Sequence, residues 1–177
     1  MKKTVLTFGL IGGAIMAAMM FATLPFLEKL GFDKGAVIGY TTMVLAFMLV
    51  FFGIRSYREN VSGGHITFGR AFAVGILITL IACACYVVAW EIIYFKFLPD
   101  FVDKYASYAV EKAKASGASQ QAVEAQVQQM KSLKALYANP LLNAAITFTE
   151  PFPIGLIITL ISAAILRRKT SVAVEQH

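Results

Sequence analysis

The amino-acid sequence predicts an all-α, polytopic membrane protein with four transmembrane helices and an extracytoplasmic amphipathic helical hairpin between the third and the fourth. The 177-residue chain is 58% hydrophobic and only 15% charged, which is far from the composition of a soluble domain. Its apolar residues gather in four stretches, each close to the roughly 20 residues with which a helix crosses a bilayer. The stretches lack the alternating pattern of barrel strands, so helices are expected to satisfy their backbone polar groups. We expect a single domain, 1–177, with spans at about 4–27, 36–54, 71–98 and 148–166 and a helical insertion at about 99–140.

The first span follows Lys2 and Lys3, a charged start that also resembles a secretory signal peptide. The apolar run is longer than the roughly 7–15 residues of a signal peptide's hydrophobic region. It closes on Pro25, Phe26 and Leu27 without a clear small-x-small cleavage site. We therefore expect the run to stay attached as a transmembrane helix.

The connection between the second and third spans is rich in arginine, which predicts the orientation of the protein. Short connections rich in Lys and Arg face the cytoplasm. On the opposite side, the turn at 28–35 has balanced charges, and lysines in the long stretch 99–140 count less toward topology. The sequence therefore predicts a multi-pass protein of the inner (plasma) membrane with cytoplasmic N and C termini. The residues on the predicted cytoplasmic side include Lys2, Lys3, Arg55, Arg58, Arg70, Arg167 and Arg168.

Residues 99–140 have the periodicity of two amphipathic helices separated by a turn. Pro99 is expected to end the third span and to start the first of these helices, and Ser119 is expected to cap the second. In the second helix apolar residues recur at steps of three or four. This stripe either packs on the first helix or on lipid headgroups, or it receives a partner protein or a second copy of the chain. Its residues are Val123, Val127, Met130, Leu133 and Tyr137.

Two carboxylates, Glu91 and Glu150, lie close to the predicted bilayer interior, where ionisable groups are costly and often functional. Counted from the arginines at about 1.5 Å per residue, both are expected near the outer edge of the hydrocarbon layer. They are either structural residues at the membrane interface, or they form an outward-facing proton- or cation-binding site with Lys96 as a counter-charge. In the structural alternative, the stretch 149–153 is the start of a helix, because prolines there lose no hydrogen bond and a carboxylate suits the helix dipole.

Small residues at four-residue spacing predict where helices contact one another. Gly9 and Gly13 form such a pair in the first span, and Gly75 belongs to a series that begins at Ala71 in the third. The contacts are either packing inside one chain or dimerisation.

The sequence contains no motif typical of catalysis or of metal or cofactor binding. The two histidines, His65 and His177, fall in a loop and in the tail, so no span offers imidazole ligands, and there is no HExxH, Walker-type loop or G-x-S-x-G. The net charge of +6 is attributed to anchoring at the anionic inner leaflet, because the arginines cluster at helix ends. We therefore expect a protein that is not an enzyme, with no cofactor, no metal and no nucleic-acid partner.

Three segments resemble a known family. These are 62–72 with its Ile-Thr-Phe-Gly-Arg-Ala-Phe core, Tyr137-Ala138-Asn139-Pro140, and 150–157 followed by Arg-Arg-Lys at 167–169. Their order over nearly the whole chain resembles an uncharacterised bacterial membrane-protein family, domain of unknown function 4199 (DUF4199). The resemblance implies a bacterial inner-membrane protein with four spans and a helical insertion before the last. It carries no activity over to any residue.

Two hypotheses from different classes follow. The first is a structural or interaction protein that engages a membrane or envelope partner, or a second copy of itself, through the outer helical hairpin. The second is a small transporter or channel subunit that uses Glu91 and Glu150 at an outward-facing vestibule. A membrane enzyme ranks third, because the sequence offers no nucleophile or acid–base pair for it.

Overall fold

The computed structural model describes residues 1–168, and all of its named elements are helices. A one-turn 3₁₀ helix, η1, joins the first two helices, and Gly31, with φ of 68°, interrupts α2 near its start. The elements are α1 (Lys2–Thr23), η1 (Leu24–Phe26), α2 (Leu27–Asn60), α3 (Phe68–Lys96), α4 (Phe101–Ala115), α5 (Gln120–Tyr137), α6 (Pro140–Phe148) and α7 (Pro151–Leu166).

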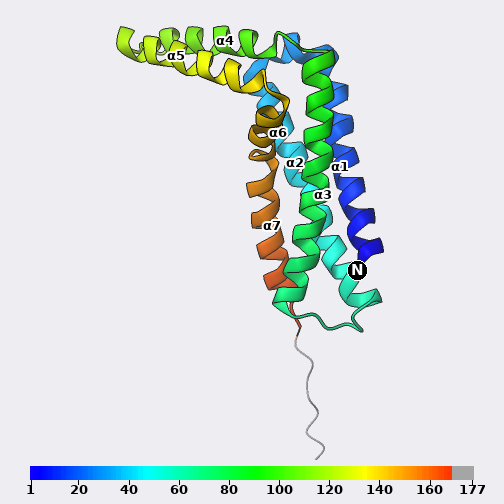
Figure 1. The fold of residues 1–177 in the computed structure, drawn as a ribbon. Helices are drawn as coiled ribbons and strands as arrows, with labels where there is room; N and C mark the ends of the chain where they lie inside the picture. The colour runs from blue at the N-terminus through cyan, green and yellow to red at the C-terminus, as the bar shows by residue number, and fades with distance from the viewer. Residues whose placement is uncertain (169–177) are drawn as a thin grey trace, which may run out of the picture.

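Four helical segments are long and apolar enough to cross a membrane, as the sequence predicted: Lys2–Phe26, Lys29–Asn60, Phe68–Lys96 and Pro140–Leu166. They lie side by side in one bundle, in which α6 and α7 follow one another as the fourth member (Figure 1). Large apolar side chains are exposed on the outward faces of the bundle, which suits contact with lipid rather than water. They include Leu10, Ile15, Val44, Phe52, Val88 and Ile161.

The helices of the bundle approach most closely at glycines. A Cβ atom on Gly9 would lie 2.8 Å from the Cβ of Ile81 in α3, and one on Gly75 would lie 2.8 Å from the Cγ2 of Thr159 in α7. Gly13 also faces α3, where its nearest neighbour is Cys85. The small-residue faces predicted from the sequence therefore pack against other helices of the same chain.

A polar contact joins α3 to α7 inside the apolar core. The hydroxyl groups of Thr79 and Thr159 lie 3.0 Å apart, and both side chains are fully buried. The Thr79 hydroxyl also lies within hydrogen-bond distance of the Gly155 carbonyl oxygen. These contacts satisfy buried hydroxyls that lipid cannot satisfy.

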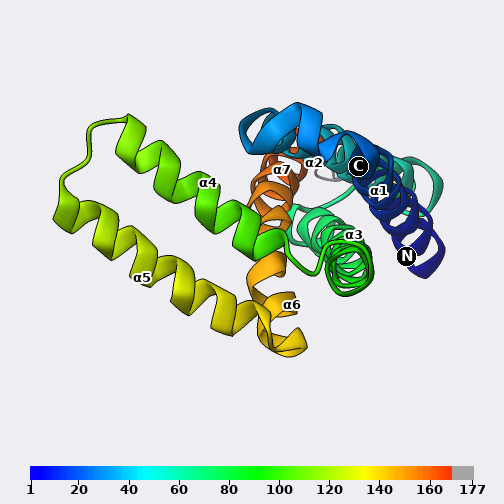
Figure 2. The same ribbon diagram turned by 90° about the horizontal axis from the view of Figure 1, so that it is seen from above.

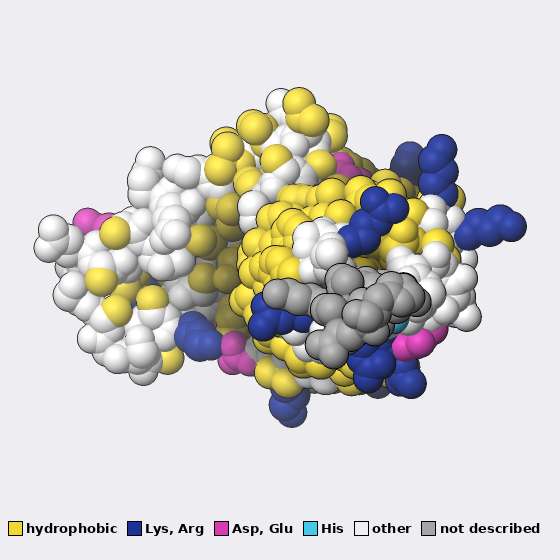
Figure 3. Space-filling model, turned by 90° about the horizontal axis from the view of Figure 1, so that it is seen from below, with side chains coloured by type: hydrophobic (Ala, Val, Ile, Leu, Met, Phe, Trp, Pro, Cys, Tyr) yellow, Lys and Arg dark blue, Asp and Glu magenta, His cyan; other side chains and the backbone are white. Residues whose placement is uncertain are grey.

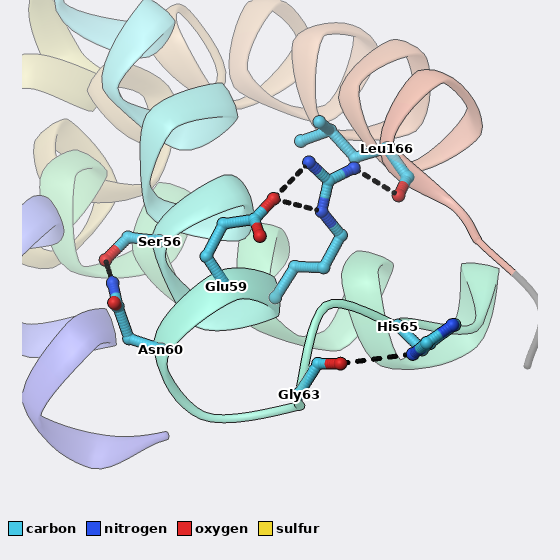
Figure 4. A network of polar contacts seen from close by, with 7 residues as sticks. Ser56, Glu59, Asn60, Gly63, His65 and Leu166 are labelled. Carbon is cyan, nitrogen blue, oxygen red and sulfur yellow. Dashed lines mark hydrogen bonds and ion pairs between the residues drawn. The ribbon is translucent and has the colours of Figure 1, made fainter.

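One end of the bundle holds all the described arginines. Arg58 donates to the carbonyl of Leu166 at 3.2 Å and pairs with Glu59 (Figure 4), and Arg70 donates to the hydroxyl of Tyr57 at 3.0 Å. Ile66 and Arg168 exchange backbone hydrogen bonds of 3.1 and 2.9 Å. Figure 3, which looks at this end, shows Lys and Arg side chains around an apolar surface. The positive charge of the chain is therefore concentrated at the end where α1 begins and α7 finishes.

At the opposite end, α4 and α5 lie side by side and project sideways from the bundle (Figures 1 and 2). The two helices are joined by a turn in which Gly117 has φ of 77° and the Ser119 side chain accepts a hydrogen bond from the backbone N–H of Ala122. Ser119 is thus the N-cap that the sequence predicted. We call these two helices the α4–α5 pair.

An aromatic cluster attaches the α4–α5 pair to the bundle. The ring of Phe32, at the start of α2, lies 5.7, 5.3 and 5.1 Å from the rings of Phe101, Tyr105 and Tyr108 in α4. Beside this cluster, Lys112 donates a 2.7 Å hydrogen bond to Asp33, which raises the pKa of Lys112 above its usual value. The first turns of α4 are therefore held against α2, and the tip of the pair extends away from the bundle.

Candidate functional site

A cavity of about 430 Å³ lies where the α4–α5 pair meets the bundle. Its walls come from the end of α1, the start of α2, the C-terminal half of α3, the first turns of α4, the last turns of α5 and the junction of α6 and α7. The volume falls in the range of about 300–1,000 Å³ that is typical of small-molecule sites. Most of the wall is aromatic or aliphatic, and the aromatic residues on it include Tyr40, Tyr86, Trp90, Phe101, Tyr105 and Tyr137.

Glu150 supplies the carboxylate of this cavity. It lies in the two-residue break between α6 and α7, where Pro151 has no N–H to continue the hydrogen-bond ladder of α6. The Tyr86 hydroxyl, on α3, donates a 2.8 Å hydrogen bond to the Oε2 atom of Glu150. Within residues 1–168, no Lys or Arg forms an ion pair with Glu150. The cavity therefore contains a carboxylate whose partner is a neutral phenol.

Tyr137, the last residue of α5, adds a second phenol to the wall. Burial, together with the nearby negative charge of Glu150, raises the pKa of Tyr137 to about 12. The Tyr137 side chain is therefore neutral at physiological pH. Its ring also lies 5.7 Å from that of Tyr94, so α5 is packed against α3 at the edge of the cavity.

Glu91 is not among the residues that line the cavity. Its Oε1 atom is buried and has no hydrogen-bond partner in the described part of the chain. Tyr86, the residue that donates a hydrogen bond to Glu150, is about one and a half turns of α3 from Glu91. The shared depth of the two carboxylates stays a prediction. Lys96 is exposed at the end of α3 and forms no ion pair with either glutamate in residues 1–168.

A second buried polar atom without a partner belongs to Asn143, whose side chain contacts Trp90. Trp90 donates from its Nε1 atom to the Oδ1 atom of Asn143 at 3.1 Å, and the hydroxyl of Thr147 donates to the same oxygen at 3.1 Å. The Nδ2 atom of Asn143 has no partner among the described residues. These hydrogen bonds hold the Trp90 indole in place on the cavity wall.

The apolar stripe of α5 lies along α4 and the cavity. Met130 is only 7% exposed, and it lies with Val127 along a groove of about 380 Å³ between α4 and α5. Leu133 and Tyr137 line the cavity, and Val123 is half-buried. In this arrangement the stripe packs mainly within the chain, while its role as a partner surface stays a prediction.

Sequence reasoning did not single out Tyr86, the hydrogen-bond partner of Glu150. One signal was available, since a tyrosine inside an apolar span needs a hydrogen-bond partner for its hydroxyl. Asn143, which is fully buried, was also missed, although an amide in an apolar stretch carries the same kind of signal.

Comparison with known proteins gives one match. Residues 7–168 match the model of a family described as "Protein of unknown function (DUF4199)", which covers nearly the whole chain. Neither curated proteins nor solved structures give a match.

Proposed function

Because the chain belongs to the DUF4199 family, whose description names no activity, we propose a function from the geometry of its own residues. The protein is a small membrane protein that binds an organic cation in the cavity at Glu150. It acts as a carrier or a receptor subunit and carries out no covalent chemistry. The observation that carries the proposal is a carboxylate without a cationic partner on the wall of a cavity that several aromatic side chains line. A bound cation supplies the missing counter-charge.

The composition of the cavity wall favours an ammonium group over a metal ion. A carboxylate and several aromatic faces together attract ammonium groups, because each ring presents its negative face to a cation within about 6 Å of its centroid. Hydrated metal ions instead require several oxygen ligands. Within residues 1–168 no group of three His, Cys, Asp or Glu side chains is arranged to hold a metal ion. The charge interaction is also stronger in an apolar cavity than in water.

The proposal includes an orientation in the membrane. The described arginines, Lys2 and Lys3 share one end of the bundle, whereas lysines near the other end have acidic neighbours such as Asp33 and Asp103. By the positive-inside rule, the arginine end faces the cytoplasm of a bacterial inner membrane. The cavity and the α4–α5 pair then lie at the outer side, where they meet ligands from outside the cell.

Exchange of Glu150 tests the proposed function. Isothermal titration of the detergent-solubilised protein with benzyltrimethylammonium is expected to show saturable binding, and Glu150→Gln is expected to weaken it at least tenfold, about 1.4 kcal/mol. The matched control, Glu91→Gln, removes a carboxylate that is outside the cavity wall and is expected to change the affinity less than twofold. Equal affinities of the wild type and Glu150→Gln would contradict the proposal.

The projection of the α4–α5 pair favours a second candidate function, the engagement of a membrane or envelope partner. Most of the pair lies beyond the bundle (Figure 2). Its exposed polar side chains include Gln121 and Gln128. A photo-crosslinking amino acid at Gln121 is expected to give a discrete cross-linked product in native membranes. A product that also forms from a crosslinker at Leu160, on the lipid-facing side of α7, would show unspecific capture.

A further inference from the structure

A smaller cavity of about 60 Å³ adjoins the cavity at Glu150 and extends it between α1 and α2. The two cavities share Thr23, Gly35, Gly39, Met43 and Tyr86 as lining residues, so they are adjacent along the same faces of α2 and α3. The wall that belongs to the smaller cavity alone includes three methionines of α1: Met16, Met19 and Met20.

At two glycines of α2, Gly35 and Gly39, the wall of both cavities is bare helix backbone. A Cβ atom on Gly35 or on Gly39 would meet nothing within 4 Å, although both residues are only half exposed and lie inside a helix. At Gly9, Gly75 and Gly155, by contrast, a Cβ atom would collide with another helix. Glycine inside a helix is destabilising relative to alanine, and at Gly35 and Gly39 no close packing within the chain explains it. Open backbone at these positions leaves room for a group that the chain itself does not supply.

The chemistry changes along the combined cavity. One part carries the Glu150 carboxylate, the Tyr86 hydroxyl and the aromatic rings, and the other is lined by methionines, which adapt to irregular apolar groups. A ligand that fits both parts has a cationic head and an apolar chain. From Met16 to Thr23 the helix rises about 10 Å, which is the scale of a medium-length alkyl chain.

We propose that the ligand is a single-chain cationic amphiphile: its ammonium head lies at Glu150, and its alkyl chain runs past Gly35 and Gly39 into the methionine-lined cavity between α1 and α2. The inference rests on the proposed function, and it names the class of ligand for the same site. The head contributes charge recognition, and each methylene that enters the apolar part is expected to increase affinity about fourfold.

A chain-length series tests the inference. The protein is reconstituted in lipid nanodiscs, and binding of tetramethylammonium, butyltrimethylammonium and octyltrimethylammonium is measured with empty nanodiscs subtracted. In the wild type, affinity is expected to rise at least tenfold from the butyl to the octyl compound. Gly39→Leu, whose side chain fills the shared wall, is expected to abolish this rise.

The matched control is Gly69→Leu. Gly69 is also a helical glycine whose Cβ would meet nothing within 4 Å, but it lies at the start of α3, far along the helix from the cavities. This variant is expected to keep the full chain-length dependence. A wild type with no chain-length dependence, or equal dependence in Gly39→Leu and the wild type, overturns the inference. The proposed function still holds if the wild type binds tetramethylammonium and Glu150→Gln weakens that binding. If the wild type binds none of the three compounds, the proposed function fails as well.

A direct label provides a readout that does not depend on the folding of a variant. An octyltrimethylammonium analogue with a diazirine at the end of its chain is expected to label Met16, Met19, Met20 or Met43 in the wild type. Labelling confined to the outer apolar surface, or a co-purified phospholipid that the compound does not displace from the cavity, overturns the inference.

Discussion

Gly155→Leu is expected to cause the largest loss of stability of any single change in the bundle. A Cβ atom at this position would lie 2.8 Å from Cε1 of Phe47, and closer still to the side chain of Thr79. Gly155 is therefore the point where α7 meets both α2 and α3, and the leucine side chain would force these helices apart. Overpacking of this kind costs about 3 kcal/mol when neighbours cannot move.

The expected readout for Gly155→Leu is a melting temperature in non-ionic detergent that falls by about 10 °C, or a protein that elutes as aggregate. Gly69→Leu is the control, because it adds the same side chain where a Cβ atom has open space. A melting temperature of Gly155→Leu equal to that of the control would show that the three helices do not meet closely at this residue.

Phe32→Ala is expected to release α4 from the bundle. The Phe32 ring contacts the rings of Phe101, Tyr105 and Tyr108, and such aromatic pairs each contribute about 0.5–1.5 kcal/mol beyond the area they bury. Loss of all three contacts removes about 2–3 kcal/mol from the attachment of α4, which corresponds to a roughly 30-fold to 160-fold larger open population.

Hydrogen–deuterium exchange measures this release, because amides of α4 exchange faster when the helix detaches. At least tenfold faster exchange is expected in α4 of Phe32→Ala, with little change in α3. Asp33→Asn is the neighbouring control: it removes the ion pair with Lys112, whose side chains are both more than half exposed, and exposed pairs contribute about 0–1 kcal/mol. If Asp33→Asn accelerates exchange as much as Phe32→Ala, the aromatic cluster is not the main attachment.

The local features of the fold followed from the sequence. The four apolar segments were recognisable because length and composition alone decide whether a helix suits a bilayer. The cap at Ser119 was recognisable because the accepting side chain and the donating N–H are only three residues apart. The small-residue faces at Gly9 and Gly75 were visible in the spacing, although their partner helices were not.

The candidate site depended on contacts between residues far apart in the chain. Glu150 was singled out as a carboxylate near a helix start, but its partner Tyr86 lies 64 positions away. The sequence left open whether the stripe at Val127 and Met130 packs inside the chain or forms a partner surface. The structure places α4 beside it. The sequence did not reveal that Glu150 lines the cavity and that Glu91 does not.

The sequence by itself therefore determined which segments are helical and apolar, where several of them start, and which end of the protein is basic, because these properties depend on neighbouring residues and on composition. Only the tertiary structure decided that Glu150, Tyr86 and the rings of three other helices surround one cavity, and that Gly35 and Gly39 face open space. Helical periodicity specifies the face on which a side chain lies but not what that face meets, and the cavity arises from how the helices are arranged against one another.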